Sequence, residues 1–254
     1  MSTDTIENTA VPEAEETAVG KKGITGAALK WIAILSMLID HIGATLIENG
    51  IYVSGSYTSA WVAADLVLRS VGRLAFPIFC FLLVQGFLHT KDMRKYLLRL
   101  MLFGVLSEIP FDLAFQRSYM DWNYQNVYFT LLLGLLAIWL WQRMDGPGFH
   151  RVLAAAAALA CVALAWLGKT DYGGWGVALI VVLYLLRDKP LWRNLAAAAA
   201  LAAANLLEVF GYFDFLLFRS YNGERGRQPK YLFYVFYPLH IGALALIRYL
   251  IYGF

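Results

Sequence analysis

Seven ionisable side chains lie inside long apolar stretches of this sequence, where a charge is costly. A charged group at the centre of a membrane-spanning helix costs about 2.5 to 3.5 kcal/mol, so each one needs a compensating role. The seven are Asp40, His41, Arg73, His89, Glu108, Asp112 and His240. Imidazoles and carboxylates that share a cavity can move protons, and an arginine among them can balance charge. The pattern indicates acid–base chemistry or ion movement within a membrane.

Asp40 and His41 are adjacent, and this spacing limits what they can do together. Neighbouring residues of a helix point in different directions, so Asp40 is not expected to orient His41. We expect Asp40 to pair with Arg73 instead, which neutralises two charges inside the membrane. His41 is then free to act as a general base, with Glu108 or His240 as its partner from another helix.

The depths of these residues place most of them in one half of the membrane. Counting about 1.5 Å per residue from the outer end of each predicted span puts Arg73 roughly 6 Å deep, Asp40, His41 and Glu108 roughly 10 Å and His240 roughly 14 Å. Shallower positions at the same end belong to Asp112, Asn126, Asp171, Tyr172 and the loop 219–230. His89 lies at the inner end. A polar cavity in the outer half follows from this segregation.

Several of these residues also have a purely structural interpretation. His240 is compatible with a hydrogen-bonded packing role, Asp112 follows Pro110 and suits a helix end, and His89 suits the membrane interface. A further cluster satisfies the positive-inside bias or could bind the phosphates of a nucleotide-like donor, and the sequence does not separate these two readings. Its members are Lys91, Arg94, Lys95 and Arg99.

The composition defines the elements that must hold these side chains. The chain has 254 residues, of which 60% are hydrophobic and 15% charged, against about 25% charged in ordinary globular domains. Its mean hydropathy is +0.57. A water-soluble single-core enzyme is therefore disfavoured, and a net charge of +3 is too small to indicate nucleic acid as a partner.

We predict an all-α polytopic membrane protein with about eight transmembrane helices, because blocks of about 20 apolar residues match the hydrocarbon core. The predicted spans are 24–47, 69–88, 96–115, 127–143, 151–168, 173–187, 191–212 and 231–252. The stretch 206–219 is interrupted by Glu208, Gly211 and Asp214, which suggests a broken or re-entrant helix. Residues 1–22 are expected to form a disordered acidic tail before a membrane domain at 23–254.

Lysine and arginine counts in alternate joints favour a cytoplasmic N-terminus, with twelve on the inner side and eight on the outer. This count assumes an even number of spans. Half of the outer cations fall in the single loop 219–230, which breaks the rule locally.

Other signals in the chain indicate scaffold rather than chemistry. Cys80 and Cys161 lie in apolar blocks and are expected to be buried free thiols. The alanine runs 154–158 and 196–200 suit close packing of membrane helices. The sequence has no phosphate-binding glycine loop, paired-cysteine motif or HxxxH metal signature, so we expect neither a metal site nor dinucleotide chemistry.

Seven segments of the chain resemble the TraX family, named for a pilin-acetylating membrane protein. They appear in the family's order and cover most of the chain beyond residue 24, apart from 145–168 and 190–218. The segments are LKWIAILSMLIDHIGA (29–44), VGRLAFPIFCFLLVQGFLHT (71–90), KYLLRLMLFGVLSEIPFDLAF (95–115), NVYFTLLLGLL (126–136), TDYGGWGV (170–177), YNGERG (221–226) and FYPLH (236–240).

The resemblance implies an acyltransferase of the bacterial inner membrane that takes acetyl groups from acetyl-CoA. Asp40 and His41 would be active-site residues. The matching motifs also contain Arg73, His89, Glu108, Pro110, Asp112, Asn126, Asp171, Tyr172, Asn222, Arg225 and His240. Gln85 departs from the pattern, because an acidic residue is expected before the glycine. The donor would reach His41 from the cytoplasmic side, with its phosphates on the basic cluster that includes Arg94, Lys95 and Arg99.

Three alternative functions are compatible with these observations. The first is acyl transfer to a peptide amine or to a sugar or lipid hydroxyl. The alternative is a small-solute or proton transporter or channel, since a polar cavity with His, Asp and Arg suits an ion path, although no internal repeat is visible. A third is a structural assembly factor, which would tolerate apolar residues at Asp40, His41 and Arg73. The acceptor and the oligomeric state stay open.

Overall fold

The computed structural model describes residues 22–204, 211–229 and 231–253, and in this part of the chain it contains helices and no strand. The all-α prediction is confirmed. The predicted acidic tail lies, except for Lys22, outside the described residues. The elements are α1 (Gly26–Ile42), η1 (Gly43–Tyr52), α2 (Ser59–Gly72), α3 (Ala75–His89), α4 (Met93–Phe111), η2 (Asp112–Gln116), α5 (Val127–Met144), α6 (Phe149–Leu167), α7 (Gly173–Leu185), α8 (Pro190–Ala204), α9 (Asp214–Arg219) and α10 (Leu232–Tyr252).

Five helical stretches in the described part are long and apolar enough to cross a membrane. One joins α1 to η1, another joins α2 to α3 across Arg73, and the others are α5, α6 and α10; the shorter α7 is also apolar. The predicted count of eight spans is not confirmed. The chain is nevertheless a multi-pass membrane protein by the length and composition of these helices.

Side-chain caps set where several helices begin. The Thr25 side chain accepts a hydrogen bond from the Ala28 amide (3.3 Å), Asp92 accepts from the Lys95 amide (3.0 Å), and Asn126 accepts from the Tyr128 amide (3.0 Å). Each cap satisfies one of the amides that a helix start leaves without a partner. Pro190 is the first residue of α8, where its missing N–H costs nothing.

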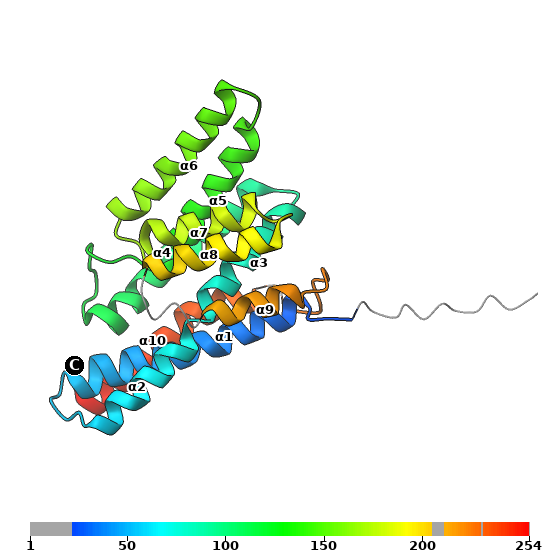
Figure 1. Ribbon diagram of the computed structural model, residues 1–254. Helices are drawn as coiled ribbons and strands as arrows, with labels where there is room; N and C mark the ends of the chain where they lie inside the picture. Colours follow the sequence, from blue (N-terminus) through cyan, green and yellow to red (C-terminus); the bar gives the residue numbers. More distant parts are fainter. Residues whose placement is uncertain (1–21, 205–210, 230, 254) are drawn as a thin grey trace, which may run out of the picture.

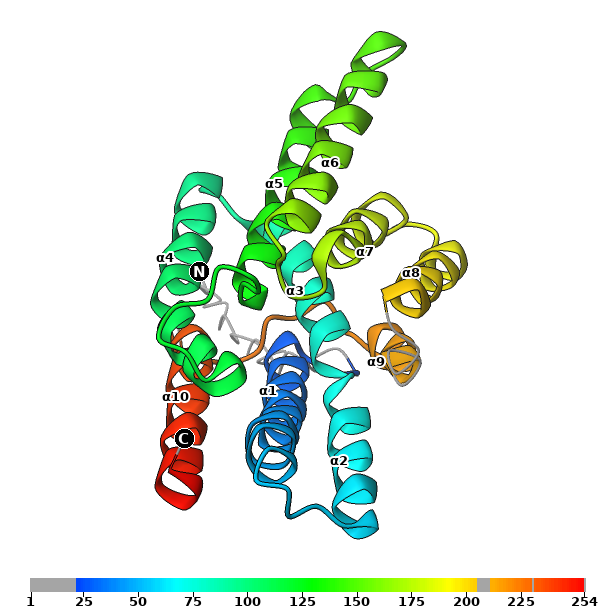
Figure 2. The same ribbon diagram turned by 90° about the vertical axis from the view of Figure 1, so that its left-hand side faces the viewer.

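Helix α3 lies at the centre of the molecule, with α1, α5, α7 and α9 around it (Figure 2). Its buried side chains point in every direction around the axis, as expected of a helix enclosed by others. The hairpin of α5 and α6 projects to one side (Figure 1). On α6 the buried residues are Ala154, Ala158, Cys161 and Ala165, a stripe of small side chains that lets α6 approach its neighbours closely. Cys80 and Cys161 are buried free thiols, as predicted.

Helices α1 and α10 run in the same direction. Near their starts the Lys30 ammonium lies 5.2 Å from the Phe233 ring centre, and Gly50 of η1, which continues α1, packs against Tyr252 at the end of α10. We call the end of the bundle at which α1, α4 and α10 begin the N-terminal face. The start of the first helix and the end of the last helix therefore lie on opposite faces, which an even number of crossings cannot produce.

The segments α8 and α9 explain this parity, because they run out and back. Arg193 in α8 and Phe218 in α9 both lie against the Phe81 ring, at 5.9 and 4.3 Å between centres. Between them Gly211 packs against Pro77, deeper in the bundle. The prediction of a single crossing at 191–212 is therefore wrong. The prediction of a broken or re-entrant helix agrees with the out-and-back course of the residues described. Glu208 lies outside the described residues.

The loop 219–230 lies on the N-terminal face, contrary to the expectation that it shares the outer end with the cavity. The Ser220 carbonyl accepts a hydrogen bond from the Ile24 amide (2.8 Å), and the Glu224 carbonyl accepts from the Gly26 amide (2.8 Å). The loop is therefore bound to the start of α1. The loop therefore adds three arginines to the face that the charge rule assigns to the cytoplasm: Arg219, Arg225 and Arg227. With the loop on this face, its cations no longer break the positive-inside rule.

Candidate functional site

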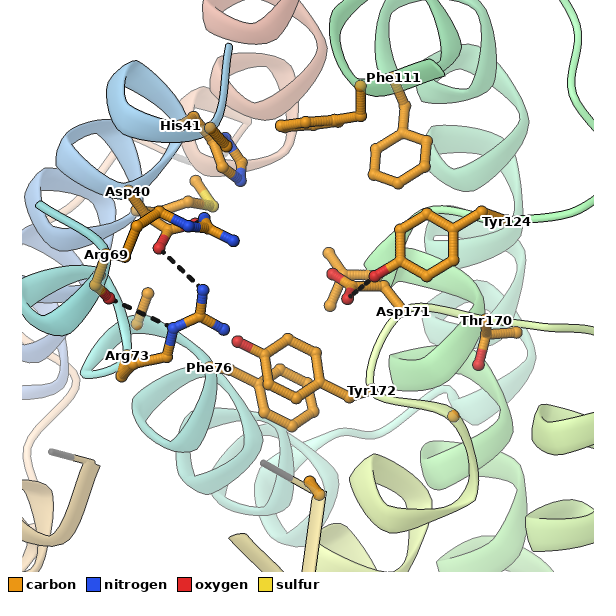
Figure 3. Close-up of a pocket in the computed structure, with 18 of the residues that line it drawn as sticks. Asp40, His41, Arg69, Arg73, Phe76, Phe111, Tyr124, Thr170, Asp171 and Tyr172 are labelled. Atoms are coloured by element: carbon orange, nitrogen blue, oxygen red, sulfur yellow. Dashed lines mark hydrogen bonds and ion pairs between the residues drawn. The ribbon is translucent and has the colours of Figure 1, made fainter. Parts of the chain in front are cut away.

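A pocket of about 970 Å³ opens in the half of the bundle away from the N-terminal face. Its walls come from the end of α1, from η1 and α2, from the start of α3, and from the loops before α5 and α7. Figure 3 shows Asp40, His41, Arg69 and Arg73 on one side and Tyr124, Asp171 and Tyr172 on the other. Of the predicted site residues, Asp40, His41, Arg73, Asp171 and Tyr172 line this pocket.

One wall is an ion cluster centred on Asp40. Arg73 Nη2 lies 3.2 Å from Asp40 Oδ1, which confirms the predicted pair, and Arg69 Nη1 contacts Asp40 Oδ2. Arg69 Nε is also 3.0 Å from Glu48 Oε1, and Arg73 Nε donates to the Arg69 carbonyl (3.2 Å). The Asp40 side chain is 15% exposed, so its charge is largely removed from water and needs these partners. Both carboxylate oxygens of Asp40 therefore bind arginines, and Asp40 does not orient His41.

His41 is oriented from α10. Its Nδ1 lies 2.7 Å from His240 Nε2, and His240 Nδ1 lies 2.7 Å from the Phe236 carbonyl oxygen. A carbonyl only accepts, so His240 Nδ1 carries the proton. In the neutral ring His240 Nε2 is then an acceptor, and His41 Nδ1 must donate to it. This leaves His41 Nε2 unprotonated, as a base at the wall of the pocket.

The opposite wall is a loop held in an unusual backbone conformation. Lys169 and Tyr172 both have positive φ (51° and 61°), which is rare for residues other than glycine, asparagine and aspartate. The loop is fixed by hydrogen bonds between the Gln125 and Lys169 backbones (3.0 Å) and between Asp171 and Gln125 (2.8 Å). The Tyr172 ring stacks on Phe76 at 3.6 Å between centres. Such conformations persist where the surroundings determine them, and they are common at binding sites.

Asp171 and Tyr124 form a hydrogen-bonded pair on this wall. The Tyr124 hydroxyl donates to Asp171 Oδ1 at 2.6 Å. Burial raises the pKa of the Asp171 carboxyl, and the Tyr124 hydrogen bond opposes that rise. The nearby Asp171 charge, together with burial, raises the pKa of Tyr124, so its hydroxyl stays protonated and acts as a donor. The pocket thus has two guanidinium groups paired with carboxylates on one wall and a further carboxyl on the other.

Glu108, Asn126 and Asp112 are not in the pocket lining. Asn126 Nδ2 donates to a Glu108 carboxylate oxygen and to the Gly104 carbonyl (2.8 Å), so these residues join α4 to the start of α5. Asp112 Oδ2 accepts from the Asp121 amide (2.8 Å) and holds the loop after η2. Of the two partners proposed for His41, the structure therefore selects His240 and not Glu108.

The remaining predicted residues lie on the N-terminal face, away from the pocket. His89 Nδ1 is 2.8 Å from the Gln85 carbonyl at the end of α3, and Lys95 is 3.0 Å from Asp92 and mostly exposed. Arg94 is exposed, whereas Arg99 is half-buried beside Tyr96. Asn222 accepts from the Glu224 amide (2.9 Å), and the Arg225 carbonyl accepts from the Ala27 amide (2.9 Å).

Sequence reasoning missed Arg69, Glu48, Asp65 and Tyr124, which all line the pocket. Arg69 had a usable signal, because it precedes Arg73 by four residues and so shares its helix face. Tyr124 had none, because a backbone pairing between distant loops brings it to Asp171. No group of three or more His, Cys, Asp or Glu side chains suited to a metal ion occurs among the residues described.

The fold and the pocket define a class: a helical multi-pass membrane protein with a buried ion cluster and an imidazole pair facing one polar pocket. The family model described as "TraX protein" matches residues 25–248. The chain therefore belongs to the TraX family.

Two curated relatives are similar to the chain. The chain is 32% identical to "Probable fimbrial assembly protein FimC, serogroup H1" of Dichelobacter nodosus, over 85% of this chain and 92% of the relative. It is 24% identical to "Uncharacterized protein RP591" of Rickettsia prowazekii (strain Madrid E), over 63% of this chain and 55% of that protein. No solved structure matches the chain.

Proposed function

We propose that this protein is an integral membrane acyltransferase that moves an acetyl group from acetyl-CoA to an amine or hydroxyl of a peptide, glycan or lipid acceptor. The observation that carries the proposal is the chain of contacts from the Phe236 carbonyl through His240 to His41. Acyl transfer needs a base that removes the acceptor proton during attack. An imidazole whose second nitrogen is fixed by another group is such a base.

In the proposed reaction His41 Nε2 takes the proton from the acceptor N–H or O–H. The acceptor atom forms a bond to the thioester carbonyl carbon, and the bond from that carbon to sulfur breaks. His41 then returns its proton to the departing thiolate, so the enzyme ends in its initial state. His240 keeps the His41 ring in place throughout, because it accepts the hydrogen bond from His41 Nδ1.

The charged walls have separate parts in this proposal. Arg73 and Arg69 stabilise the negative charge that develops on the carbonyl oxygen, since fixed cations in a site of low polarity act strongly on developing charge. Asp40 holds both guanidinium groups in place. Asp171 and Tyr124 face them across the pocket and are placed to bind the polar end of the acceptor.

The family supports a role in pilin-related membrane processes, and one relative is named as a fimbrial assembly protein. A pilin-like peptide is accordingly one acceptor class to test, beside glycans and lipids. We place the protein in the bacterial inner membrane with the N-terminal face in the cytoplasm, which gives the donor access from that face and the acceptor access from the pocket side.

The test is transfer of labelled acetyl groups by the purified protein in lipid nanodiscs. Acetyl-CoA is supplied with pilin, glycan and lipid fractions, and products are identified by mass spectrometry. We expect transfer by the wild type and a loss of about 10²- to 10⁴-fold in His41→Ala, the usual contribution of a general base. His150→Ala, an exposed histidine on α6, is the matched control. No transfer by the wild type, or equal transfer by His41→Ala, would refute the proposal.

A further inference from the structure

A second group of cations lies on the N-terminal face, far from the pocket. Lys30 from α1, Arg99 from α4 and Arg225 from the loop before α10 gather around the start of α10. The Lys30 ammonium lies 5.2 Å from the Phe233 ring centre. The charges of Arg99 and Arg225 both act on the Tyr234 hydroxyl.

Lys30 and Arg99 are half-buried, and the exposed Arg225 is carried by a backbone segment that is fixed in position. Lys30 Nζ donates to Gln228 Oε1 at 2.7 Å. Arg225 belongs to a loop fixed to α1 by backbone hydrogen bonds. Gly226 has φ +68°, and a Cβ there would lie 2.8 Å from Thr25 Oγ1, so only glycine fits. Arg99 lies 5.7 Å from the Tyr96 ring centre. A mere charge bias across the membrane does not require three cations to be positioned in this way.

The group lacks the negative charge that such a cluster needs. Among the residues that the structure describes, no carboxylate lies within ion-pair distance of Lys30, Arg99 or Arg225. Arg99 Nε is buried and has no hydrogen-bond partner. Like charges in proximity repel, and a buried N–H without an acceptor costs free energy, so the arrangement favours a bound anion with several acceptor oxygens.

We propose that Lys30, Arg99 and Arg225 form a phosphate-binding site on the N-terminal face. Phosphate supplies several oxygens and enough charge to engage an ammonium and two guanidinium groups together. Of the basic cluster formed by Lys91, Arg94, Lys95 and Arg99, only Arg99 is half-buried; Lys95 is paired with Asp92, and Lys91 and Arg94 are exposed.

Two sources of phosphate fit this chemistry: the coenzyme A part of the acyl donor and the headgroup of an anionic phospholipid. The first source rests on the proposed function, whereas the phosphate chemistry does not. Lys30 and His41 are on the same helix, and eleven residues correspond to roughly 16 Å of helix rise. A donor held by its phosphates at this site would direct its acyl end along α1 toward His41.

The experiment measures binding rather than turnover, so its outcome does not depend on acyl transfer. The full-length His41→Ala protein in nanodiscs of zwitterionic lipid is titrated with coenzyme A, and retention of phosphatidylglycerol is measured in parallel by native mass spectrometry. Both are repeated with Arg99→Gln and Arg225→Gln added. Arg151→Gln, an exposed arginine paired with Asp145, is the matched control.

Loss of one charged contact is expected to weaken binding about 10- to 100-fold. Weaker coenzyme A binding in Arg99→Gln and Arg225→Gln but not in Arg151→Gln supports a site for the donor. Unchanged coenzyme A binding with lost phosphatidylglycerol retention supports a site for a lipid headgroup. If both ligands bind the variants as they bind the control, the proposed site is refuted.

Discussion

Gly72 is a position at which one added methyl group should disturb the ion cluster of the pocket. A Cβ built on Gly72 would lie 2.2 Å from both Cβ and Oδ1 of Asp40, far inside van der Waals contact. Gly72→Ala must therefore displace Asp40 from Arg69 and Arg73. Overpacking of this kind costs about 1–3 kcal/mol, and loss of a partner from a buried ion pair costs about 3–5 kcal/mol as an upper limit.

The same substitution also gains helix propensity, by about 1 kcal/mol. Asp40 is 15% exposed, so it can shift toward solvent and avoid most of the cost of a lost ion pair. We therefore expect the free energy of unfolding to fall by about 1–3 kcal/mol, which is the cost of overpacking alone. Labelled acetyl transfer should fall at least about tenfold, as misplacement of positioning groups commonly costs.

The assay combines thermal unfolding in nanodiscs with the transfer reaction. Gly242→Ala is the matched control, since the nearest atom to its new Cβ is Pro110 Cβ at 3.8 Å, an ordinary contact. We expect Gly242→Ala to be as stable as the wild type or slightly more so. If Gly72→Ala keeps the stability and the transfer rate of Gly242→Ala, the described packing of Asp40 is wrong.

Three further predictions concern His240, Glu108 and Asp171. His240→Ala removes the acceptor for His41 Nδ1 and should lower kcat at least about tenfold, whereas His240→Gln, which keeps an acceptor, should retain more activity; equal rates would contradict the imidazole pair. Glu108→Ala should lower the free energy of unfolding by about 1–3 kcal/mol while Glu108→Gln is nearly neutral, and a large kcat loss in a stably folded Glu108→Gln would speak against a structural role. Burial raises the pKa of Asp171 above its unfolded value, so its contribution to stability is present below pH 4 or so and is lost as pH rises through the raised pKa. The melting temperature of the wild type should fall relative to that of Asp171→Asn as the pH rises from 4 to 8. Parallel curves would contradict this prediction.

The helical class and most helix positions followed from hydropathy, because the membrane makes long apolar runs the dominant signal. The helix α2 was missed over 59–68, since Asp65 and Arg69 lower its apolar character. Arg69 bonds to Asp40 from another helix, and a one-dimensional pattern does not contain this compensation.

Depth along a helix was predictable, but direction around it was not. Glu108 lies at a suitable depth, and yet its carboxylate contacts Asn126, the cap of α5, and does not line the pocket. His240 and His41 met because their helices pack with both imidazoles facing inward. The side of the loop 219–230 was missed because the out-and-back course of α8 and α9 changes the number of crossings by one.

The central claim is that His41 supplies a neutral imidazole that accepts the acceptor's proton in the pocket. Chemical rescue tests it most directly: acetyl transfer by His41→Ala is measured with increasing concentrations of free imidazole in the buffer. The account predicts a saturable recovery of transfer in His41→Ala and no stimulation of the wild type. A His41→Ala protein that is fully active without imidazole would contradict it.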